Sequence, residues 1–159
     1  MTVAYYISQL ESLFNGQPWL DETLLKKTGS LTSEQAFQRP YPPVHSAAEI
    51  LAHLIAWRQV LIKRLEGNYD YQIQMQSAQD WPSLEQLQAL GWNTLQQELI
   101  SNQTRLIELL SQQSDEVLAI PYNDQGHTFE YLINGIIQHD LYHLGQIGLV
   151  ISMLHSRHL

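Results

Sequence analysis

Two histidines four residues apart, His139 and His143, have the spacing in this sequence that most directly suggests chemistry. Apolar residues recur at helical spacing on both sides of the pair, and residues four apart on a helix lie on one face. That face also carries Leu132, Ile136, Gln146, Val150 and Leu154. Both imidazoles are therefore predicted to point into a core. A buried imidazole needs a hydrogen-bond partner or a metal ion, because an unpaired buried polar group costs about 1–3 kcal/mol.

His53 is the candidate for a third metal ligand. Ser46-Ala47-Ala48-Glu49 has the form of a capping box, and it starts a predicted helix whose apolar stripe includes His53. Facing helices in a bundle lie about 8–10 Å apart, so three such histidines can converge on one ion. Three nitrogen ligands leave a position for water or substrate, as in catalytic metal sites. The alternative, three hydrogen-bonded core histidines, stays open on spacing alone.

The other polar residues near these histidines carry weaker signals. Asp140 is expected to pair with a charge on a neighbouring element or to orient an imidazole. The capping box explains Glu49, and His45 is expected to be a helix-start residue and not a fourth ligand. The order His-Asp-Leu-Tyr-His from position 139 also resembles a zinc-peptidase motif, but aspartate replaces the glutamate base, so we discard that interpretation. No residue is assigned as a catalytic acid or base.

Composition limits the classes of function. The chain has 159 residues, 44% of them hydrophobic, which suits a single domain over residues 1–159. Its net charge of −8 and scattered Lys and Arg predict no nucleic-acid partner. It has no cysteine, so every metal ligand must be nitrogen or oxygen and any thiol must come with a substrate. No apolar stretch predicts a signal peptide or membrane span, so a cytoplasmic protein without a membrane partner is expected.

Hydrophobic periodicity predicts an all-α protein with four helical regions. The first covers residues 3–14 and continues over residues 19–27 after a break at Gly16-Gln17-Pro18. The second runs over residues 46–65, and the third starts near Pro82 and reaches about residue 110, weakened at Gly91. The fourth runs over residues 129–155, after a short extended pair or ordered loop. A polar crossover at residues 68–81 separates the second and third regions, and the four tryptophans are expected in the core or at a cavity rim.

The fourth predicted helix is apolar on nearly all sides, which indicates burial on two fronts. Opposite the histidines lie Leu141, Gly145, Gly148 and Ser152, whose small members allow another backbone to approach closely. That neighbour is expected to be either the first helix or the same helix of a second subunit. We therefore predict a homodimer.

These residues carry a resemblance to a known family. The segment Ser46-Ala47-Ala48-Glu49-Ile50-Leu51-Ala52-His53 with Trp57, and Gly135 to Ile147 with its two histidines, resemble the DinB/YfiT-like superfamily. The motifs Gly16-Gln17-Pro18-Trp19, Pro43-Val44-His45-Ser46 and Asp80-Trp81-Pro82 resemble one subgroup of it. The similarity spans essentially the whole chain. Many family members carry Trp where His45 stands, and the His-Ser version suits the subgroup.

The resemblance implies a four-helix bundle with up-down-down-up topology and a long crossover, frequently dimeric. It implies a divalent metal, zinc or nickel, bound by His53, His139 and His143. The activities it implies are hydrolysis of a small molecule or transfer of a low-molecular-weight thiol such as bacillithiol or mycothiol to an electrophile. We therefore expect a metal-dependent hydrolase or thiol S-transferase, and the alternative is a non-catalytic metal-binding stress-response or interaction protein.

Overall fold

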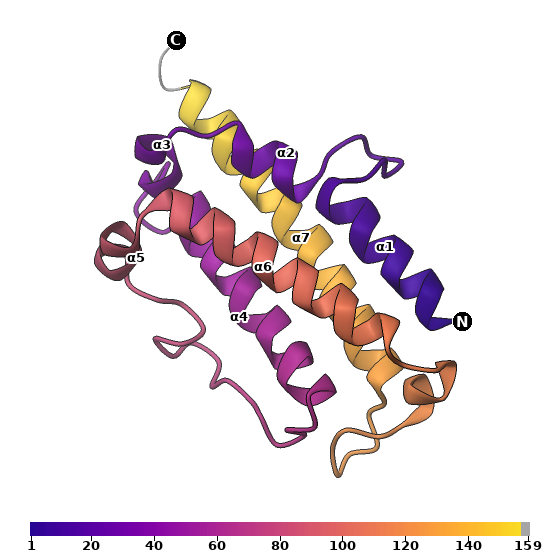
Figure 1. Ribbon diagram of the computed structural model, residues 1–159. Coiled ribbons are helices and arrows are strands. Elements are labelled where there is room, and N and C mark those ends of the chain that lie inside the picture. Colours follow the sequence, from indigo (N-terminus) through magenta and orange to yellow (C-terminus); the bar gives the residue numbers. More distant parts are fainter. Residues whose placement is uncertain (157–159) are drawn as a thin grey trace.

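The computed structural model describes residues 1–156, and within them the regular elements are helices (Figure 1). The helices are α1 (Val3–Asn15), α2 (Leu24–Gly29), α3 (Ser33–Phe37), α4 (Ala47–Leu65), α5 (Leu84–Leu90), α6 (Trp92–Ser111) and α7 (Phe129–Ser156), with a 3-10 helix, η1 (Asp115–Ala119), before α7. The long helices α1, α4, α6 and α7 form a bundle, in which α1 and α7 run in one direction and α4 and α6 in the other. The prediction of an all-α fold is confirmed.

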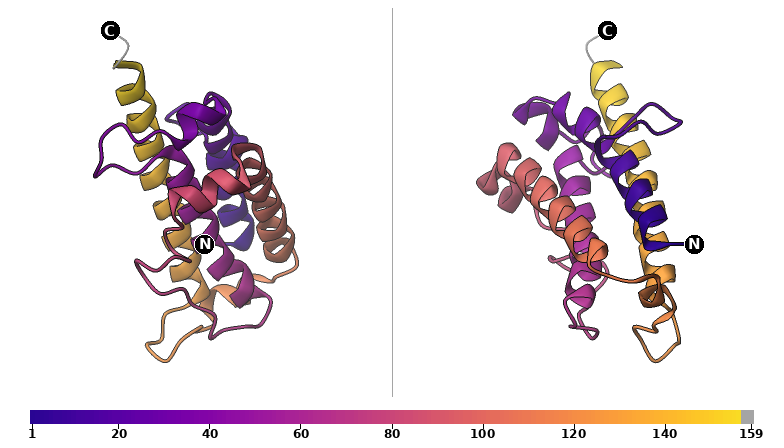
Figure 2. Two further views of the ribbon diagram at one scale, coloured as in Figure 1. Left: turned by 90° about the vertical axis from the view of Figure 1, so that its left-hand side faces the viewer. Right: turned by 45° about the vertical axis from the view of Figure 1, so that its right-hand side comes forward.

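The two helices that carry the histidines begin as the sequence predicts. Ser46 caps α4, its hydroxyl accepting from the Glu49 N–H at 3.3 Å while the Glu49 carboxylate accepts from the Ser46 N–H at 2.8 Å. Thr128 accepts from the Tyr131 N–H at the start of α7. α7 is 28 residues long and extends past the rest of the bundle at its C-terminal end (Figure 2). No helix in residues 1–156 is both long and apolar enough to cross a bilayer.

Two apolar clusters make up the core, one toward each end of the bundle. One cluster includes Leu54 of α4, Leu99 of α6 and Leu144 of α7. The other includes Leu61, Leu106 and Ile136 of the same three helices. Between these positions along the three helices lie Arg58, Gln103 and Asp140, all buried. A polar layer therefore separates the two clusters.

Two predicted helices differ from the observed ones. Residues 19–23 are not helical, because Thr23 caps α2, and Asp21 has φ +54°. Trp19 is consequently fully exposed and does not belong to the core. The third predicted helix is split at Gly91, whose φ of +90° ends α5 and starts α6. Gly91 interrupts the helix because it adopts a backbone conformation that other residues rarely reach.

The segment before α7 agrees with the short extended pair or ordered loop expected there. It contains η1, followed by an isolated antiparallel bridge between Pro121 and Thr128. The expected break at Gly16-Gln17-Pro18 is present, since α1 ends at Asn15 and α2 starts eight residues after Gly16. A side chain at Gly16 would meet the backbone of Ser12 at 2.7 Å, so glycine is required there.

Candidate metal centre

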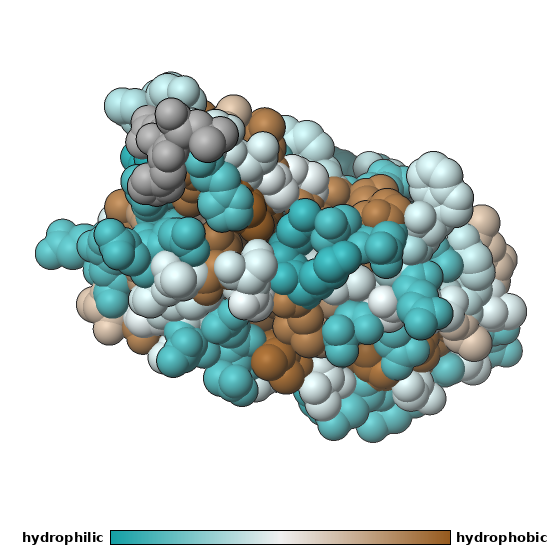
Figure 3. All heavy atoms as spheres, turned by 90° about the horizontal axis from the view of Figure 1, so that it is seen from above, coloured by the Kyte–Doolittle hydropathy of each residue, from teal (hydrophilic) through white to brown (hydrophobic). Residues whose placement is uncertain are grey.

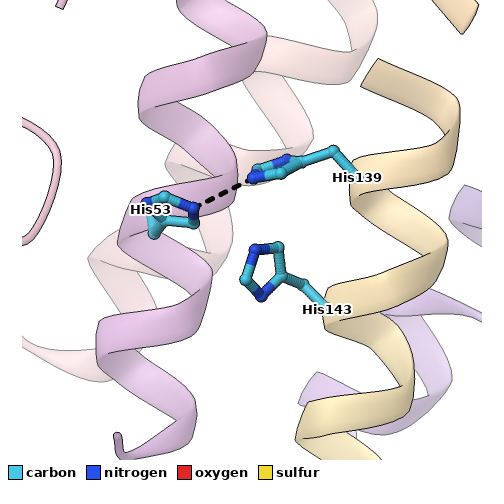
Figure 4. Close-up of side chains that lie close together, drawn as sticks. All are labelled: His53, His139 and His143. Carbon is cyan, nitrogen blue, oxygen red and sulfur yellow. Dashed lines mark hydrogen bonds between the residues drawn. The ribbon is translucent and has the colours of Figure 1, made fainter. Parts of the chain in front are cut away.

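Three imidazoles from two helices meet inside the bundle. His53 of α4 and His139 and His143 of α7 each offer one ring nitrogen, and these atoms lie within 4.8 Å of one another. The rings point toward one another across the gap between the helices (Figure 4). Nε2 of His53 and Nε2 of His139 are 2.9 Å apart. Two nitrogen lone pairs this close repel, so a proton or a cation must lie between them.

Hydrogen bonds to the outer nitrogens orient two of the rings. Nδ1 of His53 lies 2.8 Å from a carboxylate oxygen of Asp80 and 3.2 Å from its carbonyl. Nδ1 of His143 lies 2.6 Å from the side-chain oxygen of Gln146. Because these partners accept hydrogen bonds, each Nδ1 carries the proton and each Nε2 keeps its lone pair. This is the arrangement that metal-binding histidines use.

Burial lowers the pKa of all three histidines, because the low-polarity surroundings disfavour the charged ring. The pKa of His139 falls to about 3, since the neighbouring imidazoles reinforce the effect of burial. The pKa of His143 falls to about 4, although its hydrogen bond to Gln146 opposes burial. At neutral pH the rings are uncharged, which is the form that binds a metal.

We expect the metal-free protein to lose stability as the pH falls below about 6.5. The folded pKa values of His139 and His143 lie below the ordinary 6.5, so the unfolded chain takes up protons that the folded chain does not. This contribution is complete above pH 6.5 and is lost as the pH falls toward about 4 and then 3. Urea unfolding with a chelator at pH 7 and pH 5 measures the loss, and His139→Gln should reduce it.

Titration of Glu49 does not contribute to the stability difference between pH 7 and pH 5. Burial raises its pKa, but hydrogen bonds from Arg39 and Ser46 outweigh burial and lower the pKa to about 2. Its contribution is therefore lost between pH 4.5 and about 2, below the window tested. Equal stability at pH 7 and pH 5 would contradict the histidine prediction.

Aromatic side chains surround the histidines. The Trp81 ring stacks on His53 with centroids 4.0 Å apart, and it stacks equally closely on His45. The rings of Trp57 and Tyr142 lie edge-on to His53 and His143, at 6.3 Å and 4.9 Å. Tyr142 is exposed, so it lies where this group of aromatic rings meets the solvent. Trp57, Trp81 and Tyr142 therefore form an aromatic shell around the histidines.

The acidic residues next to the ligands are engaged elsewhere. Asp140 forms a completely buried, two-pronged ion pair with Arg58, with the shortest N–O distance at 2.7 Å. Arg58 also donates to Gln103 at 2.7 Å. The expectation that Asp140 pairs with a charge on a neighbouring element thus matches its observed contact. Glu49 binds Arg39 and caps α4.

The structure brings together the three histidines that the sequence singled out, and it leaves His45 outside the group. His45 is partly exposed and lies 3.3 Å from Glu49, with Trp81 against its ring. Three contacts were missed at the sequence level: those of Asp80 and Gln146 with the ligands, and the Arg58 pair. Gln146 lies one turn after His143, and its position on the histidine face was a signal. Arg58 stands in the apolar stripe with Leu54 and Leu61, which signals a buried charge.

The donor set fits a divalent transition metal. Three neutral imidazoles suit zinc or nickel, and the chain has no thiolate to compete. Nδ1 of His139 has no hydrogen-bond partner among the described residues, so Nε2 makes the polar contact of this ring, with His53, while the rings of Trp57 and His143 pack against it. A cation shared by the Nε2 atoms would fix the His139 ring as Asp80 and Gln146 fix the other two.

The fold is shared with a known protein. The chain is similar to the crystal structure of the colibactin self-resistance protein ClbS in complex with a dsDNA, with a TM-score of 0.67 and 20% sequence identity over 94% of each chain. At this identity the likeness establishes the fold. A comparison with curated proteins found no match.

One prediction must be corrected. From the net charge of −8 we predicted no nucleic-acid partner, and this is contradicted because a protein of the same fold was solved with double-stranded DNA. Net charge averages over the whole surface, whereas phosphate contacts depend on a local group of cations. Acidic composition therefore excludes less than we inferred.

A family model described as the DinB superfamily matches residues 20–147, which include all three histidines. That range covers most of the chain, all of α4, and α7 as far as Ile147. The chain therefore belongs to the DinB superfamily.

Proposed function

We propose that His53, His139 and His143 hold a divalent metal ion, zinc or nickel, and that the protein is a metal-dependent enzyme acting on a small molecule. The observation that carries this proposal is the convergence of the three ring nitrogens within 4.8 Å. Three protein ligands leave at least one coordination position for another group. A divalent ion held this way would act as a Lewis acid, which lowers the pKa of a water or thiol bound to it and so makes that group a better nucleophile at neutral pH.

The chain's own residues would bind and orient the substrate. Trp57, Trp81 and Tyr142 line the histidines and exclude water from their faces. Because the chain has no cysteine, the nucleophile in the transferase version is a low-molecular-weight thiol that arrives with the reaction. In the hydrolase version the nucleophile is water.

Metal analysis followed by two assay panels tests this proposal. The purified protein is analysed for bound zinc and nickel and titrated with each, and it is then assayed on esters and amides and on an electrophile with several thiols. Turnover that needs the added metal supports the enzyme. Absence of bound metal at every concentration would rule out the site.

Binding without turnover would support a non-catalytic metal-binding protein instead. This second candidate is favoured by one observation: the carboxylates nearest the ligands are already engaged. Asp140 binds Arg58, Glu49 binds Arg39, and Asp80 accepts from Trp57 and from the Gln76 N–H. None of the three is free to move a proton.

DNA contact is a further candidate, favoured by the ClbS complex. Most described Lys and Arg side chains are in ion pairs, namely Lys26, Lys27, Arg39, Arg58, Lys63 and Arg105. Figure 3 shows hydrophilic and hydrophobic residues interspersed at the end of the bundle that carries the C-terminal turns of α7. DNA binding would have to redirect paired cations, so weak and salt-dependent binding is expected. Fluorescence anisotropy with duplex DNA at 50 and 200 mM salt decides this.

We expect the protein to dimerise through the face of α7 opposite the histidines. Leu141 and Leu149 on this helix are 45% and 55% exposed, so α1 does not cover them. The nearest cover is α2, whose Lys27 lies over Gly148, beside a groove of about 360 Å³. Leu141→Lys, on that face, should shift the mass in light scattering from dimer to monomer, because the charge would be buried in the interface.

Leu90→Lys is the matched control for the dimer experiment. Leu90 is an exposed leucine of α5, 42% exposed and away from α7, so this change should leave the mass unaltered. A wild-type protein that stays monomeric at every concentration would contradict the dimer.

A further inference from the structure

Asp80 is a buried carboxylate on the crossover between α4 and α5. It belongs to no helix, yet it is only 2% exposed. Its carboxylate accepts from the Trp57 indole N–H at 2.8 Å and from the Gln76 backbone N–H at 2.7 Å, and it lies 2.8 Å from Nδ1 of His53. One loop residue thus contacts a candidate ligand, the α4 helix and the backbone of its own loop.

The crossover encloses the His53 ring from two directions. Asp80 contacts its Nδ1 edge, and the next residue, Trp81, stacks on its face. Gln76, whose backbone N–H donates to Asp80, has φ +61°, a conformation that residues other than glycine rarely adopt. The hydrogen bond to Asp80 therefore holds a turn that is not favourable by itself.

We propose that Asp80 is a positioning residue for the metal site, and that it couples metal binding to the order of the crossover at residues 68–83. The proposal rests on the proposed metal site. A histidine that donates Nδ1–H to a carboxylate is held in one tautomer, with Nε2 directed to the ion and made more basic. Because coupling between two sites is reciprocal, an ion bound by His53 also strengthens the contacts of Asp80 with the loop.

Zinc affinity, measured by competition with a chelator, tests the first part. Asp80→Asn keeps the size of the side chain and removes its charge, and it should weaken zinc binding about 10- to 100-fold. Asp70→Asn is the matched control, because Asp70 is an exposed carboxylate of the same crossover. The zinc affinity of this variant should equal that of the wild type.

Hydrogen exchange tests the coupling with a readout that a merely structural role would not change. Zinc should slow exchange of the Gln76 amide in the wild-type protein and in Asp70→Asn, but not in Asp80→Asn. NMR of the wild-type protein with labelled histidine provides a test that needs no variant. It should show His53 protonated at Nδ1 in the zinc-bound protein.

The outcomes separate the two proposals. A wild-type protein that binds no zinc overturns the metal site and the role of Asp80 together. A wild-type protein that binds zinc, with equal affinity in Asp80→Asn or with His53 protonated at Nε2, overturns the role of Asp80 alone. If zinc slows hydrogen exchange of the Gln76 amide equally in the wild type and in Asp80→Asn, the coupling is overturned.

Discussion

Replacing His143 with alanine is expected to reduce bound metal from about one ion per chain to a small fraction of that. The change removes one of three nitrogen ligands, and two imidazoles from different helices hold a divalent ion far more weakly than three. His143 is 5% exposed and its ring lies 4.4 Å from His139 and 4.8 Å from His53, so no other described histidine can replace it. Elemental analysis and zinc titration measure the loss, and metal-dependent turnover should fall with it.

His155→Ala is the matched control for this experiment. His155 is an exposed histidine of the same helix, so its loss should leave metal content unchanged. Thermal unfolding in the presence of a chelator shows whether His143→Ala still folds, because the metal-free wild type is the proper reference. Equal metal content in wild type and His143→Ala would mean that the metal binds elsewhere or that the site holds none.

The helices of the site were predictable because their signals are local. The capping box at Ser46 fixes the start of α4, and the observed range of α7 agrees with the apolar pattern to within one residue. With both helices in register, spacing alone placed His53, His139 and His143 on inward faces. The prediction of a helix over residues 19–27 was wrong in its first residues, because it followed the apolar spacing and neglected Pro18 and the cap at Thr23. The cap determines where α2 starts.

The residues that support the site were less predictable because their partners are distant in the sequence. Asp80 comes from a crossover without regular structure, 27 residues from His53, and no periodic pattern places it there. Arg58 and Asp140 are 82 residues apart. Each stands in an apolar stripe, which signals a buried charge, but only the packing of α4 against α7 shows that the two charges meet.

Asp140→Ala is expected to destabilise the protein by about 3–5 kcal/mol, among the largest effects of any single substitution outside the ligands. Arg58 is fully buried, so removing Asp140 leaves its guanidinium with Gln103 as its main remaining partner. The polar layer lies between two apolar clusters, so water reaches the charge only if the bundle opens. Urea unfolding at pH 7 with a chelator measures the change, and Glu98→Ala is the control, because Glu98 is an exposed carboxylate of α6.

A double variant shows whether the loss comes from the unpaired charge or from lost packing. Arg58→Met with Asp140→Leu replaces the pair with apolar side chains of similar volume, and such replacements are often neutral or stabilising. The double variant should therefore be more stable than Asp140→Ala and close to the wild type. Its metal affinity gives a separate result, because Asp140 lies between His139 and His143 on α7. Unchanged affinity would show that the ion pair stabilises the bundle without orienting the ligands, and a double variant as unstable as Asp140→Ala would contradict the unpaired-charge explanation.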